Sequence, residues 1–329
     1  MKSINIAFSD FWDGFNYSEN FFTNILSSKY HINVVDLESQ PDVLFYSFFG
    51  SNNLNANPNT IKVYFTGEND VPDFNMCDYG ISFHYLDFGA RHFRLPLYVL
   101  YPSFETLRNS YIENKPSVNR GFCSFVMSNL KISDPTRIRF FERLNEYKTI
   151  ASGGLFANNV GGHIKDKLSF ISNYKFNIAF ENSKIIGYTT EKIIDALACS
   201  SLPIYWGNPL VNLEIEESTF ININNFNSFE DAIEYIKEVD NNNNLYYQYF
   251  SAYPFKNNKY LQWEDSLLNF LTNIIETKTK YITEFGGVGI IKRKREIQDR
   301  LFRFYSTFKY LPSTFKFKYI SKLNNIFSK

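Results

Sequence analysis

Short, almost continuously apolar runs alternate along most of the chain with stretches whose apolar residues recur at helical spacing. The runs are rich in Val, Ile, Phe and Tyr, which is typical of strands buried on both faces of a parallel sheet. Alternating strands and helices predict an α/β fold. The expected strands are residues 3–8, 31–36, 42–48, 61–66, 79–85, 122–128, 176–180, 202–206 and 219–223, and the expected helices are 19–28, 134–147, 165–174, 190–199, 228–240 and 262–277.

A polar stretch at residues 109–119 interrupts this alternation, and we interpret it as a linker. Alternating strands and helices continue on both sides of it, which predicts two Rossmann-like domains with a cleft between them. We therefore expect an N-terminal domain over residues 1–115 and a C-terminal domain over residues 119–280. Residues 285–329 then form a separate tail.

The formal net charge of the 329-residue chain is zero, but the charges are unevenly distributed. Residues 285–329 hold 11 Lys/Arg and 2 Asp/Glu, so the tail carries +9 and the rest of the chain −9. An acidic body argues against a dedicated nucleic-acid binder and favours a tail with a partner of its own. Hydrophobic residues make up 44% of the chain, which excludes wholesale disorder.

The residue types that hold metals or form disulfides are few and scattered. The three cysteines have no CxxC spacing and the four histidines no HExxH pattern, so the sequence predicts no disulfide framework and no metal site and fits a reducing compartment. It also has no GxGxxG or P-loop motif, which argues against dinucleotide and P-loop chemistry. The first residues are interpreted as a strand rather than a signal peptide, and no apolar stretch of about 18 residues predicts a spanning helix.

Residues 176–211 are predicted to form a strand, a polar loop, a helix and a second strand. The loop brings Glu181 and Asn182 to the carboxyl end of a strand, where open α/β sheets bind ligands. The helix begins near Thr190, and a helix N-terminus is a ready anion site. Lys192 in the first turn opposes the helix dipole unless an anion such as a diphosphate binds above it. In the alternative interpretation, Thr190 is a simple N-cap and Lys192 is a solvated side chain.

This segment contains FENS, GY, TEKIIDAL and LPIYWG, and it resembles the signature of glycosyltransferase family 10, the α-1,3/α-1,4-fucosyltransferases. Further matches occur in the order of that family: YFTGEN at residues 64–69, FHYLDFGARHFRLPLY at 83–98 and RGFCSFVMSN at 120–129. The resemblance covers about residues 1–275 and is greatest to bacterial enzymes of the Helicobacter type. The seven-residue repeat that often precedes the tail in bacterial members does not occur here.

The resemblance implies a GT-B fold, in which two Rossmann-like domains face each other across a cleft. GDP-fucose is the implied donor, and fucose is expected to move with inversion to a hydroxyl of N-acetylglucosamine or glucose. We expect an α-1,3 linkage on lipopolysaccharide or another surface glycan, although the α-1,4 linkage stays open. The family holds the donor on the C-terminal domain and the acceptor mainly on the N-terminal one.

The motif positions also imply the catalytic groups. Glu68 in TGEN corresponds to the family's general base, which takes the proton of the acceptor hydroxyl in a single displacement. Asp70 is the alternative acid close by. Lys192 and Arg137 correspond to the cations that neutralise the diphosphate leaving group. With these cations in place, no metal cofactor is expected to be required, and a divalent ion is expected at most to stimulate.

Three further residues are implied as donor contacts: Glu191 as the carboxylate that binds the ribose, and Asn182 and Tyr188 as additional ligands. The glycine- and asparagine-containing loop at residues 153–162 receives no individual contact. Two other functions stay open, a transferase that uses another nucleotide sugar and a non-catalytic glycan-binding relative. The intact acidic and basic motif residues argue against the second.

The tail combines Lys and Arg with interleaved aromatic residues over residues 292–329. This composition is typical of a segment that lies on an anionic membrane surface. We therefore expect a cytoplasmic protein that associates peripherally with the inner face of the cytoplasmic membrane. Packing of the tail against the N-terminal domain is the alternative. Nucleic acid is not expected as a partner because no recognition motif accompanies the basic residues.

Overall fold

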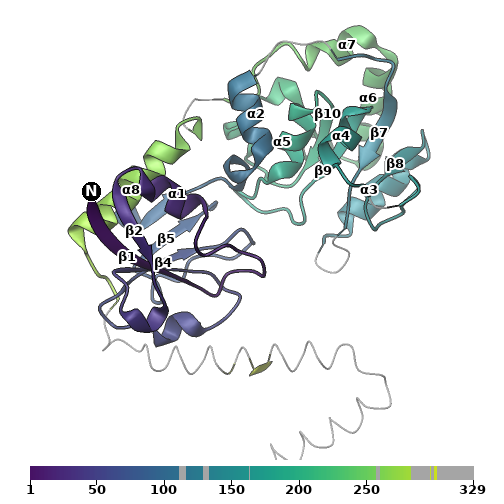
Figure 1. The fold of residues 1–329 in the computed structure, drawn as a ribbon. Helices are drawn as coiled ribbons and strands as arrows, with labels where there is room; N and C mark the ends of the chain where they lie inside the picture. Colours follow the sequence, from purple (N-terminus) through teal and green to yellow (C-terminus); the bar gives the residue numbers. More distant parts are fainter. Residues whose placement is uncertain are drawn as a thin grey trace, which may run out of the picture. The chain divides into compact units, whose positions relative to one another are not determined.

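The chain folds into two compact units, each built on a sheet with helices (Figure 1). The computed structural model describes residues 1–110, 116–128, 133–162, 164–256 and 260–282, together with 297, 300 and 301. The α/β class predicted from the sequence is confirmed. The first unit contains Met1–Phe65, Asp73–Gly80 and the described residues from Ile274 onward, and the second contains the described residues of Thr66–Pro72 and Ile81–Asn273.

The sheet formed by the first part of the chain has six strands in the order β2-β1-β3-β4-β5-β6. Strand β1 pairs in parallel with β2 and β3, and β3 pairs in parallel with β4, as the apolar runs predict. The division between the two units passes through β5. The strands are β1 (Lys2–Ser9), β2 (Tyr30–Val34), β3 (Val43–Tyr46), β4 (Ile61–Phe65), β5 (Tyr79–Ser82) and β6 (His92–Arg94).

Helix α1 (Phe21–Ser27) packs on this sheet through the buried side chains of Phe22 and Leu26. The helix begins at Asn20, whose side chain accepts from the N–H groups of Phe22 and Thr23. The Thr23 hydroxyl oxygen in turn accepts from the Asn20 N–H, which completes a capping box. The Phe22 ring stacks on Phe45 of β3 with 4.5 Å between ring centroids, so the local cap and the core contact select the same helix.

The second sheet has five parallel strands in the order β11-β10-β9-β7-β8. Its central strands are almost entirely buried, and Phe176, Phe180 and Leu202 lie in the core. Because β9 and β10 are parallel, their carboxyl ends lie at the same edge of the sheet. The strands are β7 (Gly121–Phe125), β8 (Ile150–Ser152), β9 (Tyr174–Phe180), β10 (Leu202–Trp206) and β11 (Ile221–Asn222).

Further helices follow α1 along the chain, and the last of them crosses the division between the units, so that Glu276 near its end accepts from the Tyr30 hydroxyl of the first sheet at 2.8 Å. The helices α3, α5 and α6 begin within three residues of the positions that the sequence predicts, and Ser228 caps α6 as its place before two acids suggests. The helices that follow α1 are α2 (Pro102–Ser110), α3 (Thr136–Asn145), α4 (Lys167–Ser172), α5 (Glu191–Ala198), α6 (Phe229–Asn241), α7 (Asn243–Gln248) and α8 (Trp263–Thr277).

The described residues 278–282, which follow α8, group with the first unit, so the two compact units are not separated simply at residues 115–119. Buried Asp78 accepts from the backbone N–H of Tyr281 at 2.7 Å. Lys278 Nζ lies 2.9 Å from Asp42 Oδ1. A buried carboxylate needs donors wherever the chain can supply them. These bonds explain why the end of the stretch assigned to the C-terminal domain lies in the first unit.

Four short elements lie where the sequence pattern predicts none: β6, α2, β8 and α7. Such short segments are stabilised mainly by tertiary contacts rather than by their own propensity. In α2, the Ser103 hydroxyl donates to Asp195 at 2.5 Å, and Arg108 forms a 2.9 Å ion pair with Glu264. Of the expected linker, residues 111–115 lie outside the described part of the chain.

Candidate active site

The carboxyl end of β9 leads directly into a buried carboxylate. Glu181 follows the last residue of the strand and has no exposed surface. Its Oε1 accepts from the backbone N–H of Thr190 at 2.7 Å, and its Oε2 accepts from the Thr190 hydroxyl at 2.7 Å. The same Oε2 lies 3.1 Å from Lys192 Nζ. The end of the strand therefore holds the first residues of α5.

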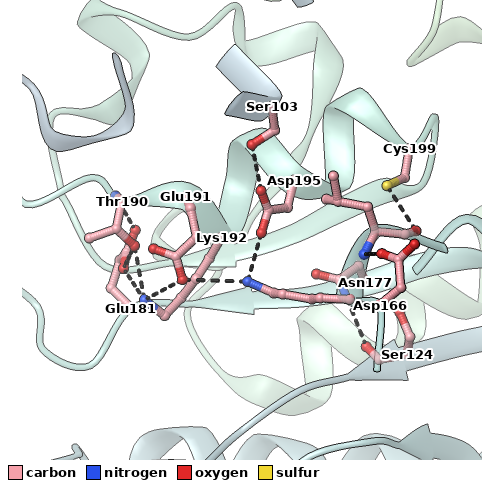
Figure 2. A network of polar contacts seen from close by, with 12 residues as sticks. Ser103, Ser124, Asp166, Asn177, Glu181, Thr190, Glu191, Lys192, Asp195 and Cys199 are labelled. Atoms are coloured by element: carbon pink, nitrogen blue, oxygen red, sulfur yellow. Dashed lines mark hydrogen bonds and ion pairs between the residues drawn. The ribbon is translucent and has the colours of Figure 1, made fainter. Parts of the chain in front are cut away.

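Lys192 lies at the centre of this polar cluster, as Figure 2 shows. Its Nζ is 3.1 Å from Glu181, 3.5 Å from Glu191 and 2.9 Å from the Thr190 hydroxyl. Burial by itself lowers the pKa of Lys192, but the charges of Glu181 and Glu191 raise it above its ordinary value. The Lys192 side chain is only 17% exposed, so its interpretation as a solvated side chain is wrong.

Thr190 occupies the N-cap position of α5, as predicted, but its hydroxyl serves the cluster. Among the described residues it accepts no bond from the first N–H groups of the helix. It donates to Glu181 and accepts from Lys192 instead. The interpretation of Thr190 as a simple cap therefore fails, because its hydroxyl bonds to charged side chains and not to the first N–H groups of α5.

Glu191, the first residue of α5, is shared between two lysines. Its Oε1 lies 3.5 Å from Lys192 Nζ and 3.4 Å from the Nζ of Lys167 on α4. Burial raises the pKa of Glu191, but the two cations outweigh burial and lower it to about 2. Lys167 also lies 2.7 Å from Asp195, which accepts from Ser103 on α2. The network in Figure 2 thus joins three helices to the end of β9.

Arg137 on α3 reaches the β9–α5 loop. Its side chain is buried, and its Nη1 donates to Asn182 Oδ1 at 2.8 Å and to Ser133 Oγ at 2.9 Å. Its buried Nε has no hydrogen-bond partner among the described residues. Burial lowers the pKa of Arg137, whereas the charges of Glu181 and Glu191 raise it. Because arginine stays protonated in proteins, Arg137 is a buried cation whose Nε–H can still donate to a ligand.

The β9–α5 loop is fixed by Asn208, which lies just beyond β10. Asn208 Oδ1 accepts from the Gly187 N–H at 2.8 Å, and its Nδ2 donates to the Thr189 hydroxyl at 3.1 Å. Gly187 has φ +87°, and a Cβ there would lie 2.5 Å from the carbonyl oxygen of Phe83. The next residue, Tyr188, is buried with its ring centroid 5.1 Å from that of Phe83. In the GY pair of the motif, Gly187 is therefore required by the backbone conformation of the loop, and Tyr188 remains a candidate ligand of the donor.

Glu68 belongs to Thr66–Pro72, a segment that groups with the second unit although β4 before it lies in the first. The Glu68 N–H donates to the Thr66 hydroxyl oxygen at 3.2 Å, and its carbonyl accepts from the Asp70 N–H at 2.9 Å. This turn leaves Glu68 exposed. Burial raises the pKa of Tyr188, and the negative charge of Glu68 raises it further. The Glu68 carboxylate therefore lies within electrostatic range of Tyr188.

The structure gathers the residues that the sequence singles out in a single unit. Sequence reasoning missed Asn208 and Lys167. Asn208 follows a buried strand at the same sheet edge as Glu181, so its place in the sequence could have identified it as a site residue. Nothing in the sequence identifies Lys167, because its pairing with Glu191 depends on how two helices pack. The six predicted residues are Glu68, Arg137, Asn182, Tyr188, Glu191 and Lys192.

The described residues also bear on metal binding and on membrane insertion. In that part of the chain, His, Cys, Asp and Glu form no group of three or more that could hold a metal ion. Also within it, no helix combines the length and the apolar character needed to cross a membrane. The tail at residues 285–329 lies almost entirely outside the described residues, and so do its membrane and packing interpretations.

Two family models match the chain. Residues 6–101 match the alpha-(1,3)-fucosyltransferase FucT N-terminal domain, and residues 117–282 match the C-terminal model of glycosyltransferase family 10 (fucosyltransferase). The chain belongs to glycosyltransferase family 10. The family inferred from the motifs is thus confirmed, and the two matched stretches together contain all six predicted site residues of this fucosyltransferase.

Relatives of this family 10 enzyme include alpha-(1,3)-fucosyltransferase FucT of Helicobacter pylori, which is 32% identical over 328 residues, covering 84% of this chain and 67% of the relative. Human 4-galactosyl-N-acetylglucosaminide 3-alpha-L-fucosyltransferase 9 is 33% identical over 147 residues, which cover 44% of this chain and 40% of the human enzyme. A crystal structure of an alpha1,3-fucosyltransferase with GDP-fucose matches with a TM-score of 0.73 and 32% identity, covering 86% of this chain and 93% of that one. The fold is therefore consistent with the GT-B architecture of this enzyme family.

Proposed function

We propose that this fucosyltransferase takes fucose from GDP-fucose and transfers it, with inversion and in an α-1,3 linkage, to a hydroxyl of N-acetylglucosamine or glucose in a glycan. The observation that carries the proposal is the pair of cations at the loop that opens α5, the buried Arg137 and the partly buried Lys192. A helix N-terminus offers free N–H groups and the positive end of a dipole to an anion. The similar alpha1,3-fucosyltransferase has been crystallised with GDP and with GDP-fucose, which supports this donor.

In this proposal the donor diphosphate binds to Lys192, Arg137 and the N–H groups of α5. Bonds between cations and phosphate oxygens are charge-assisted and about twice as strong as neutral ones. Glu191 accepts from the ribose hydroxyls, and its pKa of about 2 keeps it an acceptor at every physiological pH. Asn182 holds the Arg137 guanidinium in place, and Tyr188 completes the donor site.

Glu68 is the proposed general base. As the acceptor oxygen attacks C1 of fucose from the side opposite the phosphate, its proton passes to the Glu68 carboxylate. The C1–O bond to the diphosphate breaks in the same step, so the configuration at C1 inverts and GDP leaves. The developing charge on GDP is stabilised by Lys192 and Arg137. We propose that these cations make a divalent metal dispensable, so that added metal at most stimulates.

The acceptor is proposed to bind an aromatic platform on the first unit. Trp12 and Phe49 lie on the loops that follow β1 and β3, at the carboxyl edge of parallel strands, and they are 37% and 46% exposed. Their ring centroids are 6.3 Å apart. Buried Asp10 joins the two loops by accepting from the Asn52 N–H at 2.9 Å. A rigid aromatic surface suits the apolar face of a sugar ring.

We also propose that the enzyme meets its acceptor at a membrane surface. With a tail of +9, the full chain fits the inner face of the cytoplasmic membrane, where lipid-linked precursors of lipopolysaccharide or another surface glycan are present. Each basic residue near an anionic leaflet adds roughly 1 kcal/mol of attraction. The full chain should therefore bind anionic vesicles in a salt-sensitive way. A chain ending at Glu284 should not, and an equal response of the two chains contradicts this setting.

A donor and acceptor panel tests the function. The full chain is incubated with GDP-fucose, GDP-mannose or UDP-galactose and with N-acetyllactosamine or lactose, and the product linkage is determined by NMR. We expect an α-1,3-fucosylated product from GDP-fucose alone. Transfer from another nucleotide sugar would establish the second candidate. Acceptor binding without turnover of any donor would establish a non-catalytic glycan-binding relative.

A further inference from the structure

Glu181 is a buried acid for which the implied donor contacts and the catalytic scheme provide no role. In the described chain its hydrogen-bond partners are all donors: the N–H and hydroxyl of Thr190 and the ammonium of Lys192. The chain also makes room for it, because Gly207 has φ +154° and a Cβ at that position would lie 2.5 Å from Glu181 Cγ. A buried carboxylate costs free energy unless it is paired and hydrogen-bonded, so this arrangement is specific.

The charges around Lys192 show what Glu181 does at this site. The ammonium of Lys192 lies between two carboxylates, Glu181 at 3.1 Å and Glu191 at 3.5 Å. The polar partners of Arg137 in the described chain, Asn182 and Ser133, are neutral. Lys192 is therefore already neutralised before any ligand arrives, whereas Arg137 is not. A diphosphate that binds Lys192 has to share it with Glu181.

We propose that Glu181 is a positioning residue that acts through Lys192 as the internal counter-anion of the donor site. It holds the ammonium at the start of α5 and, by its negative charge, limits how tightly a diphosphate binds there. Its charge repels the donor and the product GDP alike, so its benefit to turnover is the release of GDP after transfer. This inference rests on the proposed function, in which the diphosphate binds at Lys192.

Calorimetric titration of Glu181→Gln with guanosine, GMP and GDP tests the proposal. Glutamine keeps the size and an oxygen for the Thr190 N–H but removes the charge that competes for Lys192. The affinity for GDP should rise about three- to tenfold, the affinity for GMP less, and that for guanosine should stay within about twofold, because the change is electrostatic. Product inhibition by GDP in the transferase assay should tighten by the same factor. Asp240→Asn is the matched control, because Asp240 is a buried acid whose ion pairs are with Lys175 and Lys148.

The outcomes separate a charge effect from a structural one. If Glu181→Gln loses affinity equally for guanosine, GMP and GDP, or if GDP binding is unchanged, Glu181 only supports the fold and the inference is wrong. If the wild-type chain binds no GDP, the proposed function fails before this test is reached.

A second variant covers the case in which Glu181→Gln does not fold, as judged by its thermal melting. Thr190→Val removes a neutral partner of both Glu181 and Lys192 and leaves the ammonium to the two carboxylates. Its affinity for GDP should fall about two- to fivefold while guanosine binds as before, since without the hydroxyl the Lys192 ammonium is held by the carboxylates alone and is shared less readily with a diphosphate. An unchanged affinity for GDP, or an equal loss for guanosine, overturns the inference.

Discussion

Arg137 Nη1 donates to Asn182 Oδ1 at 2.8 Å, although the two residues are 45 positions apart in the chain. Arg137 is on α3, and Asn182 belongs to the loop after β9. The bond aims a buried guanidinium at the loop that opens α5, and it leaves the Nε of Arg137 without a partner in the described chain. The donor site we propose depends on this relationship.

Replacing Arg137 should therefore weaken the binding of GDP more than it weakens the fold. Arg137→Ala removes a charge-assisted contact worth roughly 1.5–3 kcal/mol, which is about 10-fold or more in affinity. Calorimetry with GDP measures the loss. Arg139→Ala on the exposed face of the same helix is the control and should bind GDP like the wild type. Equal affinities for the two variants would show that the diphosphate is held elsewhere.

Glu68→Gln should abolish transfer while GDP still binds. Loss of a general base costs roughly 10²–10⁴ in kcat, and the amide keeps the size of the side chain. Asp70→Asn, two residues away, should retain most of the activity. The comparison of kcat for the two variants decides which acid takes the proton. If Asp70→Asn lowers kcat far more than Glu68→Gln does, Asp70 is the base.

The pH at which the affinity for GDP begins to fall in acid should depend on Lys167. The pKa of Glu191 is lowered from 4.5 to about 2, despite burial, by Lys192 and Lys167. A group whose pKa is depressed on folding contributes stability above its unfolded pKa, here near 4.5, and this contribution is lost as the pH falls toward about 2. Lys167→Ala removes one cation, so the pKa of Glu191 should rise toward 4.5.

The measurement is the Kd for GDP as a function of pH. In the wild type, titration of Glu191 should leave the affinity unaffected above about pH 4. In Lys167→Ala the affinity should begin to fall at a higher pH. Lys165→Ala, an exposed lysine just before α4, serves as the control. Superimposable profiles for the wild type and Lys167→Ala would show that Lys167 does not set the pKa of Glu191.

Trp12→Ala should raise the KM for the acceptor and leave the Kd for GDP unchanged. Truncating an aromatic anchor of a binding surface costs more than about 1 kcal/mol, so an increase of at least about fivefold is expected. Val34→Ala removes another exposed apolar side chain of the first unit and should have no such effect. An unchanged KM in Trp12→Ala would rule out the aromatic platform as the acceptor surface.

Transfer should continue in the presence of EDTA. Lys192 and Arg137 supply fixed positive charge where a nucleotide diphosphate would otherwise need a divalent ion. Initial rates with EDTA and with added Mn²⁺ measure the dependence. Rates within about threefold of each other fit the proposal, because stimulation by a metal is then a small term. Complete loss with EDTA, restored by Mn²⁺, would point to a metal-dependent mechanism.

The α/β class and most elements could be predicted from the sequence, because the runs of 61–66, 176–180 and 202–206 are almost continuously apolar, which is typical of buried parallel strands. The motif residues were also found without the structure. Glu191 and Lys192 are adjacent in the chain and open a helix, so their shared position is a local property.

The grouping of distant segments and the partners of the buried charges were determined only by contacts between residues far apart in the chain. The sequence does not show that Thr66–Pro72, which carries Glu68, belongs to the second unit, or that the chain after α8 returns to Asp78. It gives Glu181 a place after a strand but no role, because its partners, Thr190 and Lys192, reach it only when α5 packs against β9. Propensity and patterning act over a few residues. The partner of a buried charge is instead determined by which segments the tertiary fold places together.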